Sequence, residues 1–128
     1  MSESNAPPIG AIAWTDLTVD DAESIRDFYE EVAGWQPSPV DMGGYKDFNM
    51  MASDQAIAGI CHRRGANADL PSQWMIYIIV DHLDERIERC RRLGGGVLVE
   101  PKQMGAHGRY GIIRDPAGAV CALFEPAC

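Results

Sequence analysis

The sequence predicts an α+β protein built from two βαβββ units of about 55 residues each, because one order of elements occurs twice. A strand, an acidic helix start, an amphipathic helix and a glycine stop follow one another between Ala11 and Trp35. The same order begins again at Trp74, and Asp20 matches Asp81 when the chain is shifted by 61 positions. Helix starts, helix stops and the later hairpin turns coincide at this offset, which predicts two paired units around one core.

The first unit opens with a strand over Ala11–Val19 and continues into a helix. Asp20 is expected to cap this helix, with Glu23 three residues later as in a capping box. Gly34 supplies the left-handed stop. The apolar residues of the helix recur at helical spacing and must pack on a sheet; they are Ile25, Phe28, Tyr29 and Val32.

Three short segments complete the first unit. Two prolines limit Trp35–Val40 to an edge strand or an irregular crossing. Tyr45–Ala52 and Gln55–Arg63 are interpreted as a hairpin. The polar stretch at residues 64–73 is rich in turn residues, so we interpret it as the linker between the two units.

The second unit repeats the pattern of the first. Asp81 is expected to cap its helix, Pro101 to close a short strand, and Asp115 to open a turn. The predicted strands of this unit are Trp74–Val80, Val97–Glu100, His107–Arg114 and Ala119–Glu125.

The composition fits one domain at residues 10–126 after a flexible tail at residues 1–9. The 19 acidic and 11 basic residues give a net charge of −8, which disfavours nucleic acid and anionic membranes as partners. No apolar run approaches the roughly 20 residues of a membrane span. The chain start lacks signal-peptide features and the four cysteines show no CxxC spacing, so we expect a cytoplasmic protein with reduced thiols.

Family likeness is carried by three stretches, WTDLTVDDAESIRDFYEEVAGW, IYIIVDHLDERIERCRRLGGGVLVEP and GRYGIIRDPAGAVCALFEP. They resemble the opening and closing modules of the vicinal-oxygen-chelate superfamily, which includes glyoxalase I, bleomycin-resistance proteins and extradiol dioxygenases. The resemblance implies that modules at about 10–63 and 74–126 each curl into a half-barrel. Together they would form a cupped, barrel-like mixed sheet, with the helices outside and a ligand site in the concavity.

In metal-dependent members of this superfamily, four inward positions supply His, Gln or Glu to a divalent cation. The resemblance places these positions at Trp14, Cys61, Met75 and Ala122. They offer a thiol and a thioether but no imidazole or carboxylate, the donors that a hard divalent ion requires. We therefore predict no metal and no cofactor, which disfavours glyoxalase or dioxygenase chemistry that depends on a metal.

Strand alternation from these positions predicts the lining of the cup, with Gly59 and Val120 on the same walls. The lining is apolar and aromatic, which suits a small organic ligand; alternatively, these side chains fill the interior of a small barrel. Tyr77 and Asp16 would orient the ligand, and Arg109 at the rim would hold an anionic group. The predicted ligand-binding residues are Trp14, Asp16, Ile57, Cys61, Met75, Tyr77, Arg109, Ala122 and Phe124.

Asp16 is the candidate catalytic residue, because a carboxylate beside Trp14 on an inward face could accept a proton from a substrate. The alternative is an Asp16 that lies at the strand end and contacts water or a lysine. Cys61 and His62 are neighbours on one strand and point to opposite faces, so we do not expect a thiol–imidazole dyad.

Three functions are compatible with these features. The first is metal-independent binding of a small, largely apolar or aromatic molecule, as in bleomycin-resistance proteins. The second is a lyase, isomerase or dioxygenase-like enzyme, with or without a displaced divalent metal. The third is an interaction module with a filled concavity. The resemblance also implies a homodimer.

Overall fold

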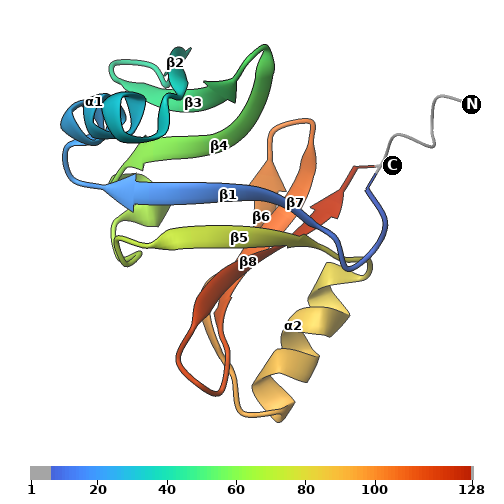
Figure 1. Ribbon diagram of the computed structural model, residues 1–128. Helices are drawn as coiled ribbons and strands as arrows, with labels where there is room; N and C mark the ends of the chain where they lie inside the picture. Colours follow the sequence, from blue (N-terminus) through green and yellow to red (C-terminus); the bar gives the residue numbers. More distant parts are fainter. Residues whose placement is uncertain (1–6, 128) are drawn as a thin grey trace, which may run out of the picture. The chain divides into compact units, whose positions relative to one another are not determined.

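The computed structural model describes residues 7–127, which form eight strands and two α-helices (Figure 1). The chain divides into two compact units, residues Trp14–Trp74 and residues 7–13 with 75–127. Each half of the chain follows the order βαβββ, so the predicted α+β class is confirmed. Residues 1–6 of the predicted tail lie outside the described part. Within that part, no helix is long and apolar enough to cross a membrane.

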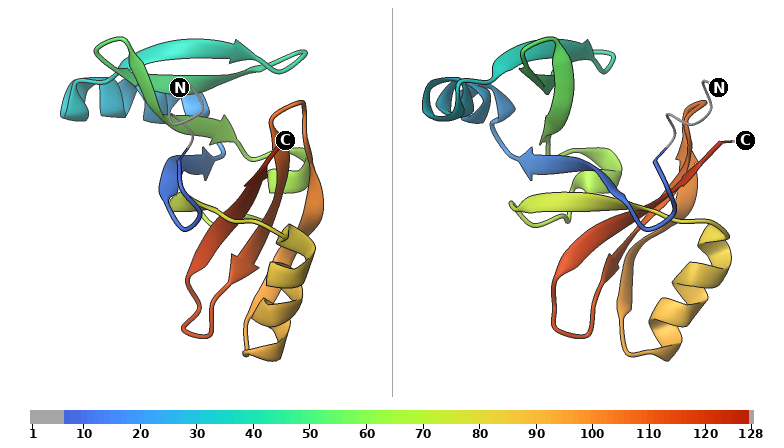
Figure 2. Two further views of the ribbon diagram at one scale, coloured as in Figure 1. Left: turned by 90° about the vertical axis from the view of Figure 1, so that its right-hand side faces the viewer. Right: turned by 45° about the vertical axis from the view of Figure 1, so that its right-hand side comes forward.

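The first unit is a mixed sheet with its helix on one face (Figure 2). Its elements are β1 (Ile12–Val19), α1 (Ala22–Ala33), β2 (Gln36–Asp41), β3 (Lys46–Ala52), β4 (Gln55–His62) and the 3-10 turn η2 (Gly65–Asn67). The strand order is β2-β3-β4-β1, in which β1 and β4 are parallel and the other neighbours antiparallel. β2 contains both prolines and lies at the edge, one of the two positions that the prediction allowed.

Helix α1 begins one residue later than predicted. Asp21 is the N-cap, and its carboxylate accepts a hydrogen bond from the Ser24 backbone N–H at 3.2 Å. The predicted cap, Asp20, pairs instead with Arg63 at 2.5 Å. The helix ends at Gly34, whose φ of 74° is the left-handed conformation that the predicted stop requires.

Only half of the apolar stripe of α1 is covered. Ile25 and Tyr29 pack against the core of this unit, whereas Phe28 is 52% exposed and Val32 is 66% exposed. The prediction that the whole stripe packs on the sheet is therefore wrong, because periodicity identifies the apolar side of a helix but not how much of it is covered. The buried core of this unit consists of Ala22, Phe48, Met50 and Ile60.

One arginine fastens the predicted linker to β1. Arg63 donates hydrogen bonds to the carbonyl oxygens of Leu70 at 3.1 Å and Thr18 at 3.2 Å. Its guanidinium also contacts the carboxylate of Asp20 and the hydroxyl of Ser72. Five N–H donors in a fixed fork suit this cluster of acceptors.

The second unit has the same architecture, with α2 against one face of its sheet (Figure 2). Its elements are β5 (Trp74–Ile79), α2 (Leu83–Arg92), β6 (Gly96–Met104), β7 (Gly108–Arg114) and β8 (Val120–Pro126). The strand order is β5-β8-β7-β6, with β5 and β8 parallel. Leu83 and Ile87 of α2 are buried and pack with Val80 and Leu123, whereas Leu93, just after the helix, is 75% exposed.

Two predicted details of this unit are wrong. The N-cap of α2 is His82, with φ of 50°, because the predicted cap, Asp81, pairs with Arg86 at 2.6 Å. The strand predicted to stop before Pro101 continues to Met104 as β6. Pro101 is tolerated because β6 is an edge strand with irregular pairing to β7, where a missing N–H costs little.

Candidate functional site

Trp14 and Asp16, two of the predicted site residues, contact each other directly. They lie two residues apart on one face of β1, and the Trp14 Nε1–H donates to Asp16 Oδ1 at 2.6 Å. Asp16 pairs with Gly59 on β4. A Cβ at Gly59 would lie 2.3 Å from Asp16 Oδ1, so the glycine leaves the space that this carboxylate occupies.

Cys61 lies on the same side of β4 as Gly59, and its backbone pairs with Thr18. Burial raises the pKa of its thiol strongly, and the nearby carboxylates of Asp16 and Asp47 raise it further. A hydrogen bond to the Asp47 carboxylate also favours the protonated thiol. Because the thiolate is the nucleophile and the metal ligand, Cys61 is poorly suited to either role at neutral pH.

The imidazole of His62 lies between two carboxylates. Its Nδ1 is 3.3 Å from Asp47 Oδ1, and its Nε2 is 3.1 Å from Glu23 Oε1 on α1. Asp47 Oδ1 also accepts the His62 backbone N–H at 2.9 Å. Asp47 therefore contacts both Cys61 and His62, a connection that the sequence did not indicate because it depends on the β3–β4 register.

The remaining predicted lining residues fall in two groups. Ile57 is a half-buried residue of β4, in the first unit. In the second unit, Tyr77 pairs with Ala122 and Ile79 pairs with Phe124 across the parallel strands β5 and β8. Alternation then places Met75, Tyr77, Ala122 and Phe124 on one face, with the first three buried and Phe124 half-buried.

Arg109 is engaged by carboxylates of its own unit. Its Nη2 lies 3.0 Å from Asp84 Oδ2 on α2, and its Nε lies 3.1 Å from Glu125 Oε1 on β8. The hydrogen bonds to Asp84, the larger cause, and to Glu125 raise the pKa of the guanidinium. Binding of a ligand anion by Arg109 stays a prediction, and such an anion would compete with two carboxylates.

The residues at the four family ligand positions do not fit a divalent cation. Trp14 uses its single polar hydrogen to bind Asp16, Cys61 keeps its proton, and Met75 and Ala122 offer a thioether and a methyl group. In the described part of the chain, no group of three or more His, Cys, Asp or Glu side chains could hold a metal ion. No step through a metal can be derived from this donor set.

The sequence profile of the Glyoxalase/Bleomycin resistance protein/Dioxygenase superfamily matches residues 11–123. The chain therefore belongs to this superfamily, as the resemblance of its motifs implied.

Two curated relatives are similar over most of this chain. CFP32 of Mycobacterium bovis, which carries a provisional glyoxylase name, is 27% identical over 118 residues, covering 92% of this chain and 45% of the relative. The anthracycline biosynthesis protein DnrV of Streptomyces peucetius is 29% identical over 129 residues, covering 91% of this chain and 47% of the relative. The chain thus spans about half the length of the curated relatives it matches.

Solved structures agree in fold. A hypothetical protein from Bacillus halodurans has a TM-score of 0.64 at 14% identity, covering 93% of this chain and 96% of that one. Methylmalonyl-CoA epimerase from Mycobacterium tuberculosis has a TM-score of 0.56 at 20% identity, with 96% and 93% coverage. At these identities the likeness shows the shared fold alone.

Proposed function

We propose that this protein binds a small, flat, largely apolar or aromatic molecule without a metal ion, on the face of β1 and β4 that carries Trp14 and Asp16. The observation that carries the proposal is the 2.6 Å hydrogen bond between Trp14 Nε1 and Asp16 Oδ1. This bond fixes an indole ring for stacking and a carboxylate for a ligand hydroxyl or amine. A few fixed polar groups in an apolar wall are typical of small-molecule sites.

The curated relatives suggest which ligand class to test first. DnrV is named for anthracycline biosynthesis, and anthracyclines contain a planar anthraquinone ring system. A planar aromatic ring stacks on an indole with a gain of about 0.5–1.5 kcal/mol beyond its buried area. An anthracycline is therefore the first probe for this site.

Titration of the protein with an anthracycline, followed through the visible fluorescence of the ligand, tests the proposal. We expect saturable one-to-one binding that weakens at least tenfold in Trp14→Ala and several-fold in Asp16→Asn. Leu93→Ala is the matched control, because Leu93 is 75% exposed in the second unit. Equal affinities in all four proteins would contradict the proposed site. Loss of binding after dialysis against EDTA would contradict metal independence.

An enzyme is the second candidate, favoured by the position of Asp16. Its carboxylate is held beside an indole, where it could take a proton from a bound substrate. The provisional glyoxylase name of CFP32 suggests the hemithioacetal of methylglyoxal and glutathione as a first substrate. Turnover that disappears in Asp16→Asn while ligand binding persists would establish catalysis in place of binding alone.

A cytoplasmic homodimer is the proposed working state. Family resemblance supports the dimer, and the unbridged thiols of Cys61, Cys90 and Cys121 are consistent with a reducing compartment. Sedimentation velocity at micromolar protein concentration tests the dimer. A single monomeric species up to about 100 μM would contradict it, since weak dimers with dissociation constants in that range are half formed there.

A further inference from the structure

We propose a second ligand site, separate from the Trp14–Asp16 face: an apolar groove of about 310 Å³ that binds a flat, neutral aromatic molecule with a hydrogen-bond acceptor. Side chains alternate along β1, so Leu17 and Val19 face away from Trp14 and Asp16. The site, here called the α1 groove, lies wholly within the first unit, which ends at Trp74, the first residue of β5. Its apolar lining is Leu17, Val19, Ile25, Phe28, Tyr29 and Trp74.

The α1 groove leaves apolar surface of its helix open to solvent. Phe28, which lines the groove, is 52% exposed. Covering the rest of Phe28 would remove its exposed apolar surface from water, which favours binding. A ligand in the groove gains this burial without any rearrangement of the core.

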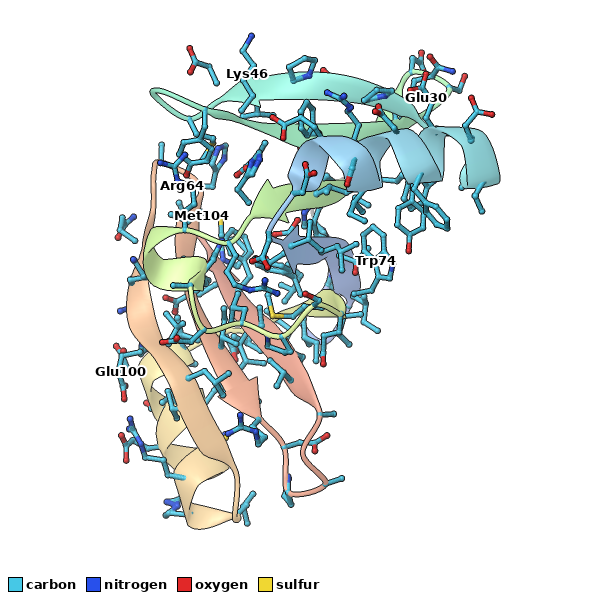
Figure 3. All side chains as sticks on the ribbon, turned by 90° about the vertical axis from the view of Figure 1, so that its left-hand side faces the viewer. Glu30, Lys46, Arg64, Trp74, Glu100 and Met104 are labelled. Carbon is cyan, nitrogen blue, oxygen red and sulfur yellow. The ribbon has the colours of Figure 1, made fainter. Side chains whose placement is uncertain are left out.

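Aromatic rings form one wall of the groove. Tyr29 stands at the centre: its ring lies 5.0 Å from that of Phe28, 5.6 Å from Trp35 and 5.3 Å from Trp74, centroid to centroid. Figure 3 shows the Trp74 side chain close to α1. The three rings that line the groove, Phe28, Tyr29 and Trp74, meet edge-on, so they offer ring faces and edges to another flat ring. The wall therefore selects a planar aromatic molecule over a flexible aliphatic chain.

The hydrogen bonds of the polar groups at the groove indicate that the ligand should carry an acceptor. The Trp74 Nε1–H already donates to the Tyr29 hydroxyl oxygen at 3.1 Å. Among the described residues, none accepts the phenolic proton of Tyr29 in return. Ser72 at the groove already accepts a hydrogen bond from Arg63. A ketone or ester oxygen on the ligand would take the Tyr29 proton and complete this chain of bonds.

The charge of α1 excludes an anionic ligand. The helix carries Glu23, Asp27, Glu30 and Glu31 against Arg26, so four acidic residues minus one basic residue leave a charge of −3. Arg26 is already bonded to Asp27 at 2.9 Å. A carboxylate or sulfonate in the adjoining groove would meet this negative field, and a neutral molecule would not.

A matched pair of fluorescent probes tests the charge requirement. The volume of the groove is at the lower end of the roughly 300–1,000 Å³ of ligand pockets, which suits about two fused rings. The neutral probe 6-propionyl-2-(dimethylamino)naphthalene has two fused rings and a ketone, and its emission shifts to the blue in apolar surroundings. The anionic analogue 6-dimethylamino-2-naphthalenesulfonate keeps the ring and the amine. We expect one-to-one binding of the ketone and at least tenfold weaker binding of the sulfonate.

Two charge-adding variants on one helix locate the probe. Phe28→Glu places a charge and removes a ring in the groove, so we expect at least tenfold weaker binding of the ketone. Val32→Glu is the matched control, because it adds the same charge one turn further along α1 without lining the groove. Tyr29→Phe keeps the ring but removes the hydroxyl, and we expect about fivefold weaker binding. Far-UV circular dichroism checks that each variant folds.

Several outcomes would overturn the proposal. These are the lack of saturable binding, equal affinity for the two probes, and equal losses in Phe28→Glu and Val32→Glu. Loss of ketone binding in Trp14→Ala would show that the probe binds on the other face of β1. Binding that declines as protein concentration rises, together with dimer formation in sedimentation, would identify a second copy of the chain as the occupant.

Discussion

Gly59 is the residue on which the geometry of the Trp14–Asp16 pair depends. A methyl group at position 59 would lie 2.3 Å from Asp16 Oδ1, so the carboxylate must move in Gly59→Ala and its bond to Trp14 must break. That lost bond costs about 1 kcal/mol. The smaller backbone entropy of the unfolded alanine chain offsets about 0.4–1 kcal/mol of this.

We therefore expect Gly59→Ala to change the tryptophan emission and weaken anthracycline binding while unfolding stability in urea changes by less than about 1 kcal/mol. The control is the same substitution in an Asp16→Ala background, where no carboxylate obstructs the methyl group. If Gly59→Ala has the same effect on emission in both backgrounds, the clash with Asp16 is not its cause.

Cys61 gives a second prediction at the scale of single residues. Burial, Asp16 and Asp47 all raise the pKa of its thiol, so little thiolate is present at pH 8. We expect iodoacetamide to leave Cys61 unmodified in the folded protein and to modify it in guanidinium, as followed by peptide mass spectrometry. Asp47→Asn should accelerate the reaction less than unfolding does, because burial is the larger cause. Asp115→Asn is the control, because Asp115 raises the pKa of the Cys121 thiol and is not among the groups that raise the pKa of Cys61.

Among the elements, the segment before β5 depends on Arg63. This side chain bonds two carbonyl oxygens, a hydroxyl and a carboxylate, and lysine cannot reproduce its planar fork. We expect Arg63→Ala to lower the free energy of unfolding by about 2–3 kcal/mol, Arg63→Lys by about 1–2, and the amides of residues 64–73 to exchange faster. Arg64→Ala is the control, since Arg64 is exposed above the Tyr45 ring. Equal losses at both positions would argue against this role.

The same elements show what the sequence could predict. Both helices and the β3–β4 hairpin followed from periodicity and turn residues, which are local signals. Both caps were displaced by one residue because Asp20 and Asp81 bind Arg63 and Arg86 instead. At the site, alternation placed Trp14 and Asp16 on one face, but the contacts of Asp47 and Gly59 arise from strand register, which no local pattern encodes.

At the scale of the whole molecule, net charge opposes the exposed apolar surface. The chain carries −8 at neutral pH and approaches zero near its isoelectric point of about 4.7. Phe28 and Val32 are exposed on α1, and their apolar side chains do not change with pH. When repulsion between molecules vanishes, such apolar surface promotes association. We expect turbidity to rise sharply between pH 5.5 and about 4.7 and to reverse when the pH is returned to 7.

Two variants, one on α1 and one on β6, separate the contributions of apolar surface and charge to this association. Val32→Glu removes apolar surface and shifts the isoelectric point only slightly, so it should reduce turbidity at the isoelectric pH. Lys102→Glu is the control, because Lys102 is exposed and its replacement adds negative charge without removing an apolar side chain. Val97→Glu would not serve, since Val97 packs on the core of its unit. If Lys102→Glu reduces turbidity at its own isoelectric pH as much as Val32→Glu does, charge alone governs the association. If Val32→Glu acts more strongly, the open face of α1 is the surface through which molecules meet.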